Sequence, residues 1–270
     1  MQLNTAQETL LLPLVGRYMA SQEWPELFPD RHAAKLSRVF DFSKYEQGKS
    51  KMPKLIYGLR YKLNVELAKS YLEEHPQTVV VNLGAGLDSL YEDLDNGSFH
   101  YLNLDFPEVI ALREKFLPLH ARESNLASDL LDFSWLDKVN FNPDNGIIFL
   151  SAGVFYYLRV EEVKALVQQM AKKFPGGRLC FDNECPQLIK KSNRLVENSG
   201  ISNAKMHFIL DEPELMAGWS ERLSKFKLWT KYGEIWPGYQ EIPLRYRLPL
   251  NAMGRSKGMY IVQMDFAKEA

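Results

Sequence analysis

The stretch VVVNLGAGLDSL, residues 79–90, indicates the fold and the kind of ligand that this chain binds. It begins as a β-branched apolar run and then places Gly84 and Gly86 on either side of Ala85. A buried strand that enters such a turn and continues into a helix lets backbone N–H groups approach a ligand closely, because glycine has no Cβ in the way. The pattern predicts a nucleotide-like ligand at the turn.

Short apolar runs alternate with amphipathic stretches from Thr78 onward, which is typical of βα units that build a parallel sheet. Residues 160–174 carry one apolar stripe at helical spacing that ends at Pro175. The sequence therefore predicts an α/β fold. Its predicted strands are residues 78–83, 100–105, 146–153, 177–184 and 260–266, with 225–229 as a weaker candidate.

The first 75 residues differ from the rest because they look helical, most clearly over Tyr57–Leu72. We expect residues 1–75 to be a helical extension that forms part of the active-site cover. Residues 76–270 are expected to form the core, with a cap insert around 186–222 and loops around 233–255, where Trp, Pro and Gly are frequent.

Composition excludes several classes of protein. The 33 basic and 34 acidic residues nearly balance, so no overall field would attract nucleic acid or an anionic membrane. Cys180 and Cys185 are too few for a disulfide scaffold, and neither they nor the scattered histidines have metal-ligand spacing. The start, MQLNTAQETLLL, lacks the cationic region of a signal peptide. We expect a cytoplasmic protein without a metal, a membrane or a nucleic-acid partner.

The second predicted strand ends in Asp105, about twenty residues after the glycine turn, where a carboxylate can accept hydrogen bonds from both ribose hydroxyls. A dinucleotide fingerprint would need a third glycine where this chain has Ser89. Asp88 falls near the start of the next helix, where its charge would oppose a pyrophosphate, unless it is simply an N-cap. S-adenosylmethionine has no phosphate and carries a positive sulfonium, so the pattern favours this methyl donor over NAD.

The stretch NLGAGLDS followed by YLNLDFPEVIALREKFLP resembles the leucine carboxyl methyltransferase family and its TcmP-like O-methyltransferase relatives. The resemblance extends from about residue 5 to at least 185. It implies a Rossmann-like fold: a seven-stranded, mostly parallel sheet with helices on both faces, an N-terminal helical extension and a cap. Further matching segments are ETLLLPLVGR (8–17), DFSKY (41–45), Leu59-Arg60, SDLLD (128–132), SAGVFYYL (151–158) and KFPGGRLCFD (173–182).

The resemblance also implies roles for single residues. Gly84 lines the cofactor, Asp105 holds its ribose, and Arg60 matches the arginine that pairs with the donor's carboxylate. Asp129 and Leu130 match a pair that contacts adenine. The alternatives without a role in cofactor binding are a surface arginine for Arg60 and a helix cap for Asp129. The expected cofactor-binding residues are Arg60, Gly84, Ala85, Gly86, Asp88, Asp105, Phe106, Ser128, Asp129, Leu130, Ser151 and Ala152.

At one position the sequence departs from the family pattern. Many members have Glu-Gly after the fourth strand, whereas this chain has Ala152-Gly153. The resemblance implies that this glutamate helps to place the methionine end of the donor. Its loss means either that another acid, such as Asp88, substitutes for it or that the protein binds the donor without turning it over.

The catalytic residue is not evident, and three candidates follow from position. Tyr156 follows the fourth strand, where an aromatic face can contact a sulfonium, although most such aromatics are core. His207 lies in the expected cap, and Arg17 would orient an acceptor carboxylate. A carboxylate acceptor needs no base at neutral pH, whereas a phenol benefits from one, so the lack of an obvious base slightly favours a carboxylate.

The sequence therefore predicts an S-adenosylmethionine-dependent methyltransferase that acts on an oxygen, carboxylate or hydroxyl, of a small-molecule or peptide acceptor. The first alternative is a protein that binds S-adenosylmethionine or S-adenosylhomocysteine without catalysis, because of Ala152. The second is an NAD-dependent oxidoreductase, which Asp88 and Ser89 oppose. The oligomeric state cannot be read from these patterns.

Overall fold

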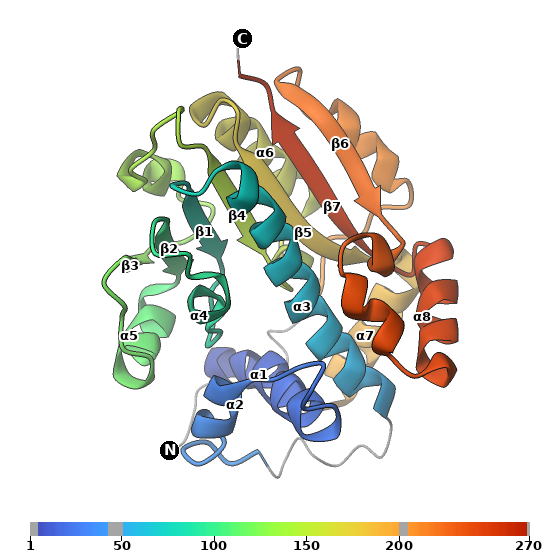
Figure 1. Cartoon of the computed structure of the whole chain (residues 1–270). Helices are drawn as coiled ribbons and strands as arrows, with labels where there is room; N and C mark the ends of the chain where they lie inside the picture. The colour runs from blue at the N-terminus through green and yellow to red at the C-terminus, as the bar shows by residue number, and fades with distance from the viewer. Residues whose placement is uncertain (1–4, 43–50, 200–204, 269–270) are drawn as a thin grey trace.

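A seven-stranded sheet forms the centre of the computed structural model, which describes residues 5–42, 51–199 and 205–268 (Figure 1). The strand order is β3-β2-β1-β4-β5-β7-β6; neighbours from β3 to β5 are parallel, and β7 is antiparallel to both β5 and β6. This confirms the predicted mostly parallel sheet. The strands are β1 (Val79–Leu83), β2 (His100–Asp105), β3 (Glu123–Ala127), β4 (Ile147–Ser151), β5 (Arg178–Glu184), β6 (Leu223–Trp229) and β7 (Met259–Phe266).

Helices cover both faces of this sheet, as expected; α3 lies in front of it and α6 behind it in Figure 1. The α-helices are α1 (Thr5–Glu23), α2 (Arg31–Leu36), α3 (Lys51–Glu74), α4 (Leu90–Leu94), α5 (Pro107–Phe116), α6 (Val160–Lys173), α7 (Pro186–Ser199) and α8 (Leu244–Arg255). Short 3-10 turns are η2 (Phe133–Lys138), η3 (Phe155–Tyr157), η4 (Pro213–Gly218), η5 (Tyr232–Glu234) and η6 (Pro237–Glu241). Among the described residues, no helix is long and apolar enough to cross a membrane.

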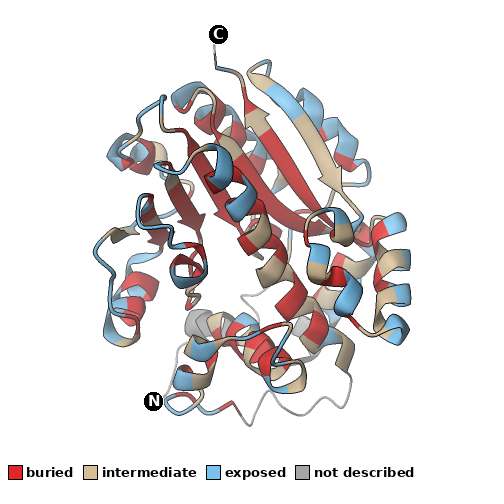
Figure 2. Ribbon diagram, in the orientation of Figure 1, coloured by how far each residue is buried: buried red, intermediate tan, exposed pale blue. Residues whose placement is uncertain are grey.

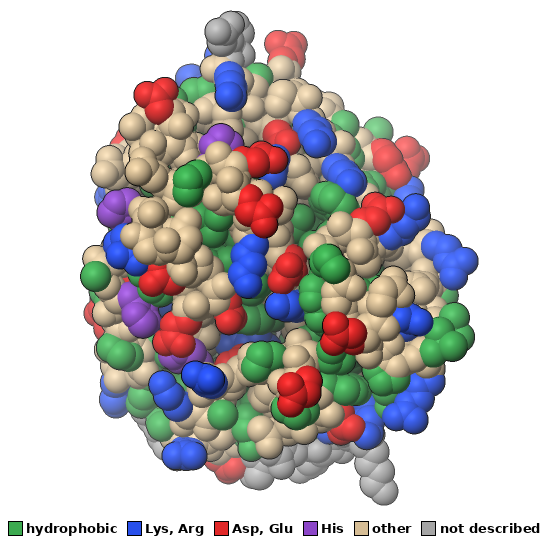
Figure 3. Space-filling view, in the orientation of Figure 1, with side chains coloured by type: hydrophobic (Ala, Val, Ile, Leu, Met, Phe, Trp, Pro, Cys, Tyr) green, Lys and Arg blue, Asp and Glu red, His purple; other side chains and the backbone are tan. Residues whose placement is uncertain are grey.

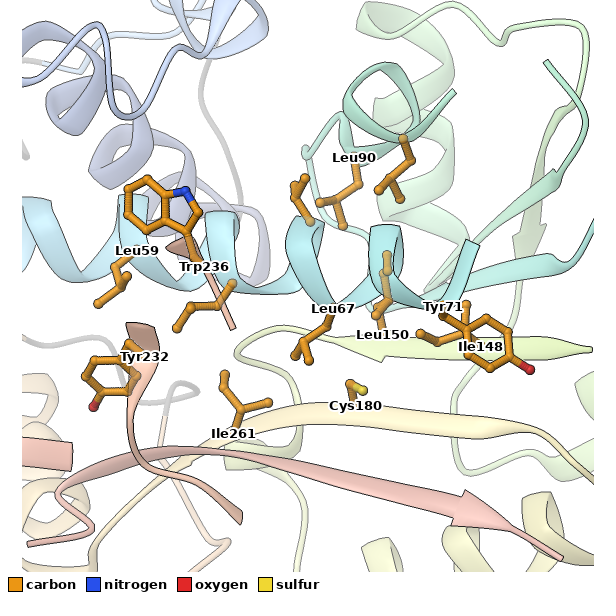
Figure 4. Close-up of a cluster of buried hydrophobic side chains, with 14 of the residues drawn as sticks. Leu59, Leu67, Tyr71, Leu90, Ile148, Leu150, Cys180, Tyr232, Trp236 and Ile261 are labelled. Carbon is orange, nitrogen blue, oxygen red and sulfur yellow. The ribbon is translucent and has the colours of Figure 1, made fainter. Parts of the chain in front are cut away.

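Alternating residues of the inner strands build two separate cores. Ile148 and Cys180 contribute to the core under α3, whereas their neighbours Phe149 and Phe181 contribute to the core under α6. The cause is the two-residue period of a strand, which directs successive side chains to opposite faces. Figure 4 shows the first of these cores, with Leu67 and Tyr71 of α3 directed towards the strands. The inner strands are accordingly mostly buried, β4 along its whole length, whereas no residue of β6 is fully buried (Figure 2).

The N-terminal helices lie beyond the carboxyl ends of the parallel strands, at the bottom of Figure 1. A third apolar cluster joins α1 and α2 to α5 and to Leu87, next to the glycine turn. Helix α1 also contacts α3 closely, because a Cβ on Gly16 would lie only 2.2 Å from the ring of Tyr57. The predicted helical N-terminal extension is therefore present, and it packs against the end of the sheet where the glycine turn lies.

Two parts of the structure differ from the sequence prediction. Strand β3 was not predicted, because ESNLA is polar and lies at the edge of the sheet with none of its residues fully buried. The loops expected around 233–255 contain α8, which carries Pro249 inside it. This helix is held by tertiary contacts: Leu250 is fully buried, and Gly254 allows the carbonyl of Thr230 to approach. Residues 43–45 of DFSKY and 200–204 of the expected cap lie outside the described residues.

Replacing Phe149 by alanine tests the core under α6. Its ring is fully buried between Trp135 and Phe174, with ring centroids 6.2 and 5.0 Å away. We expect Phe149→Ala to lower the free energy of unfolding by about 3–5 kcal/mol in urea titrations, because it removes buried surface and leaves a cavity. Leu248→Ala is the control, since Leu248 is 55% exposed, and should change it by less than about 0.5 kcal/mol. Equal losses in the two variants would contradict this packing.

Candidate functional site

The glycine turn after β1 is built by two glycines with different tasks. Both have positive φ, +67° at Gly84 and +50° at Gly86. A Cβ on Gly84 would lie 2.3 Å from Val154, so this position has no room for a side chain. A Cβ on Gly86 would meet only Leu10, at 3.7 Å. Gly84 thus lets the turn pack against the loop after β4, and Gly86 leaves open space beside the turn.

Asp105, at the end of β2, holds the glycine turn through its carboxylate. Its Oδ2 accepts a hydrogen bond from Gly86 N and its Oδ1 one from Phe106 N, both at 2.8 Å. The residue is 8% exposed, and burial raises its pKa although these hydrogen bonds oppose the shift. Each carboxylate oxygen keeps a further lone pair for a ligand hydroxyl. Phe106 beside it is 48% exposed and presents its ring near the surface.

Arg113 of α5 supports the same turn and was missed by sequence reasoning. Its Nη1 donates to the carbonyl oxygens of Ala85, Gly86 and Asp88, at 3.3, 2.9 and 3.0 Å. It is 2% exposed among the buried apolar residues of its helix. The available signal was weak, namely one arginine on the apolar side of PEVIALREKF. Through these three bonds, Arg113 holds the carbonyl groups of the turn, while the N–H groups of Gly84 and Ala85 donate to the carbonyl of Leu104.

Asp88 has its partners inside the protein. Both carboxylate oxygens accept from Asn82 Nδ2, at 2.9 and 3.0 Å, and Oδ1 lies 4.0 Å from Arg113 Nη1. Burial raises the pKa of this carboxyl group, and Arg113 and Arg17 oppose the shift. Helix α4 begins at Leu90, so Asp88 precedes the helix as the sequence predicted.

A buried carboxylate at Asp182 connects three elements, and sequence reasoning missed this residue too. Oδ1 accepts from Gly153 N at 2.6 Å, and Oδ2 accepts from the Tyr156 hydroxyl at 3.0 Å. Arg60 Nε lies 2.8 Å from the same Oδ2. The signal that could have found it is the run FDNE, which places acids at the carboxyl end of a predicted parallel strand that pairs with β4.

Arg60 is fixed against the loop after β4. A Cβ at Gly153 would lie 2.4 Å from Arg60 Nη2, and Gly153 has φ +74°. The Cζ of Arg60 lies 5.7 Å from the ring centre of Tyr156 and 5.9 Å from that of Tyr57. Burial opposes the charge of Arg60, yet Asp182 and the neighbouring tyrosines hold its pKa above the ordinary value. Neither terminal nitrogen has a hydrogen-bond acceptor among the described residues, so the guanidinium can still bind an anion.

The three catalytic candidates lie in different surroundings. Tyr156 is buried, and its pKa is raised well above the ordinary value, first by burial and then by Asp182. The side chain of His207 is exposed, while its backbone N donates to the carbonyl of Tyr156 at 2.6 Å. Arg17 pairs through Nε with Asp30 at 2.9 Å and lies over the ring of Tyr61. It lines a hollow just above α1, visible in Figure 3.

The remaining expected cofactor residues follow β3 and β4. Ser128 N donates to the carbonyl of Asp105 at 2.9 Å, which keeps these two strand ends together. Asp129 is exposed and accepts from Leu131 N, while the carbonyl of Leu130 accepts from Trp135 Nε1. Within the described ranges, the buried hydroxyl of Ser151 has no partner, and Ala152 beside it is half-buried. No group of three metal-ligating side chains exists in the described part of the chain.

Removing the Asp182 carboxylate should destabilise the fold strongly. Asp182→Ala leaves the guanidinium of Arg60 without its counter-charge, and the Arg60 side chain is only 15% exposed. We therefore expect the free energy of unfolding to fall by about 3–5 kcal/mol. Asp137→Ala is the matched control, because Asp137 pairs with Lys173 at the surface and is 75% exposed. Urea titrations measure both. A loss below about 1 kcal/mol for Asp182→Ala would mean that this ion pair does not hold α3 to β5.

Comparison with known proteins gives matches of several kinds. The family model described as "Leucine carboxyl methyltransferase" matches residues 13–171. The tetracenomycin polyketide synthesis O-methyltransferase TcmP of Streptomyces glaucescens is 27% identical over 204 residues, 74% of each chain. The S-adenosyl-L-methionine-dependent methyltransferase dpfgK of Gibberella zeae is 24% identical over 198 residues, 67% of this chain and 66% of that protein.

Among solved structures, the plantazolicin methyltransferase BpumL in complex with a triazolic desmethylPZN analogue and SAH shares the fold. Its TM-score is 0.50, with 15% identity over 97% of this chain and 99% of that one. The seven-stranded sheet with its order 3-2-1-4-5-7-6 agrees with this likeness. Because the family model matches more than half of the 270 residues, the chain belongs to the leucine carboxyl methyltransferase family and is an S-adenosylmethionine-dependent O-methyltransferase.

Proposed function

We propose that the chain holds S-adenosylmethionine across the carboxyl ends of β1, β2 and β4, with the ribose on Asp105 and the donor's carboxylate on Arg60. One observation carries this proposal. Arg60 is held by Asp182 at 2.8 Å, yet its two terminal nitrogens have no acceptor among the described residues. A mostly buried cation with free donors suits an anionic ligand group, and the donor's carboxylate is such a group.

Other features of the site fit an adenosine-containing donor. The space beside Gly86 leaves room for a ligand at the turn, since a Cβ there would meet only one atom, at 3.7 Å. The buried Ser151 hydroxyl, unpaired among the described residues, is a polar group that a ligand can satisfy. The half-exposed ring of Phe106 offers an apolar surface next to Asp105, which suits adenine. Ser128, Asp129 and Leu130 lie after β3, at the same edge of the sheet.

The bound donor supplies a methyl group on a positively charged sulfur. The contribution of the chain is to hold an acceptor oxygen in line with that group and to exclude water. We assign the second task to residues 1–75 as a cover, because α1 and α2 pack next to the glycine turn through Leu87. The Tyr156 hydroxyl donates to Asp182 at 3.0 Å, and we assign it to positioning Asp182.

In this proposal another acid takes the place of the glutamate that many family members have where this chain has Ala152. Asp88 is not a suitable substitute for the family's glutamate, since Asn82 and Arg113 already engage its carboxylate. The acids at the end of β5 lie next to β4, and Asp182 accepts directly from the N–H of Gly153. We therefore propose that β5, through Asp182, supplies the negative charge at this end of the site.

The acceptor is a small molecule or a peptide in this proposal. The name of TcmP refers to polyketide synthesis, and BpumL was solved with plantazolicin analogues. We also propose a cytoplasmic location, which the free thiols of Cys180 and Cys185 support, because a reducing compartment keeps thiols unpaired.

Calorimetric titration with S-adenosylmethionine, S-adenosylhomocysteine and NAD tests the proposed donor site. We expect binding of the first two and none of NAD. Asp105→Ala should weaken binding about tenfold to a hundredfold, because hydrogen bonds to a charged acceptor are lost. Asp137→Ala, at an exposed carboxylate, is the control and should bind normally. Unchanged affinity in Asp105→Ala would reject the ribose role.

The carboxylate of Asp105 should also make the binding of S-adenosylhomocysteine depend on pH. The ionised form of Asp105 accepts the ribose hydroxyls, so protonation competes with the ligand. Since burial raises the pKa of Asp105, we expect affinity to fall as the pH decreases, starting at a higher pH than an ordinary aspartate would give. Calorimetry at a series of pH values measures this. Asp105→Asn should bind S-adenosylhomocysteine more weakly, and its affinity should no longer fall with pH for this reason. The same pH dependence in wild type and Asp105→Asn would contradict the ribose role of Asp105.

A further inference from the structure

Three asparagines lie side by side across the neighbouring strands β1, β2 and β3. Asn82 is the register partner of Asn103, and Asn103 is the register partner of Asn125. Register partners on parallel strands point to the same face of a sheet, so the three side chains form a polar row. The row starts two residues before Gly84 of the glycine turn, and both Asn82 and Asn103 are buried.

Each end of this polar row meets a carboxylate. At one end, Asn82 Nδ2 donates to both oxygens of Asp88, at 2.9 and 3.0 Å. At the other end, Asn103 Nδ2 donates to Glu123 Oε1 at 2.7 Å and to Asn125 Oδ1 at 3.2 Å. Glu123 is the first residue of β3, and its side chain is only 7% exposed. Two mostly buried carboxylates therefore stand at the ends of the row.

Arg113 connects these two carboxylates to the glycine turn. Its Nη2 lies 3.6 Å from Glu123 Oε1, and its Nη1 lies 4.0 Å from Asp88 Oδ1. The same Nη1 donates to the three carbonyl oxygens of the turn. Because a guanidinium group is planar and its donors form a rigid fork, a carboxylate beside Nη2 sets the direction in which Nη1 donates. The turn after β1 thus depends on Glu123, although β3 lies on the far side of β2.

The stability of the fold alone does not account for this network. The Arg113 side chain is 3% exposed, and its Nε has no hydrogen-bond partner among the described residues. Asn103 Oδ1 is also buried and without a partner in the part of the chain that the structure describes. Apolar side chains of similar volume are often as stabilising as a buried ionic network, or more so. What the network does provide is a fixed orientation of the Arg113 guanidinium.

We propose that Glu123 is a positioning residue for the methyl donor: it orients Arg113, which holds the glycine turn in the shape that receives the donor. This inference rests on the proposed function, which places the donor at that turn. Asp105 accepts from Gly86 N at 2.8 Å, so a displaced turn also disturbs the carboxylate that holds the ribose. Donor affinity therefore depends on a side chain of the edge strand.

The first test removes a carboxylate from each of two mostly buried arginines in the full chain. Glu123→Ala removes the partner of Arg113. Asp265→Ala is the matched control, because its carboxylate lies 2.6 Å from Arg178 Nε at the amino end of β5. Urea titration measures the stability of both variants, and calorimetry measures their binding of S-adenosylhomocysteine. We expect both to be less stable, whereas only Glu123→Ala loses affinity, by about tenfold. Unchanged affinity in Glu123→Ala, or equal losses in the two variants, would overturn the proposal.

Two further variants separate positioning from packing. Glu123→Gln keeps an acceptor oxygen but removes the charge, so its affinity should lie between those of wild type and Glu123→Ala. Arg113→Lys keeps the charge but loses the planar fork, and we expect it to weaken binding about tenfold or more. If Glu123 acts through Arg113, adding Glu123→Ala to Arg113→Lys should weaken binding by less than about twofold further. Losses that simply multiply would contradict the proposal.

The outcome for wild type separates this inference from the proposed function. If wild type does not bind S-adenosylhomocysteine, the proposed function fails, and this inference fails with it. If wild type binds and Glu123→Ala binds equally well, only this inference fails. If circular dichroism shows that Glu123→Ala is unfolded, Glu123→Gln replaces it, with Asp265→Asn as its control. A loss of about threefold or more is then expected in Glu123→Gln alone, and equal affinity in the two would overturn the proposal.

Discussion

The geometry of the site depends on the buried carboxylate of Asp182. It accepts from Gly153 N at 2.6 Å and from the Tyr156 hydroxyl at 3.0 Å, and it lies 2.8 Å from Arg60 Nε. A buried charge is costly unless its partners are all present, so these three contacts must form together. They join the loop after β4, the turn η3 and the long helix α3. Since α3 also packs on α1, the placement of the cover depends on the same carboxylate.

The two ends of the donor site are held by different means. At the glycine turn, Arg113 engages three carbonyl oxygens from one side and Asp105 accepts the N–H of Gly86 from the other. At the end of β4, the chain has Ala152, and in our proposal the negative charge comes from β5 instead. In this proposal Arg60 pairs with Asp182 and still binds the donor's carboxylate through its terminal nitrogens.

Local patterns in the sequence were sufficient for most of the fold. Six of the seven strands, the helix α6 and the glycine turn were predictable, because β-branched runs, a helical apolar stripe and paired glycines act over a few residues. Asp105 was predictable from its distance to the turn. Strand β3 and helix α8 were not, since ESNLA is a polar edge strand and α8 depends on buried Leu250 and on Gly254.

The sequence by itself therefore determined the alternation of strands and helices, the glycine turn and the family. Each of these depends on residues that are close together in the chain. Only the tertiary structure decided which charges meet. Arg60 and Asp182 lie on different elements far apart in the chain, and Arg113 reaches the glycine turn from α5. No spacing rule connects such residues, because their contact follows from the order of strands in the sheet and from the way α3 crosses it. The partners of Asp88 follow from the same packing.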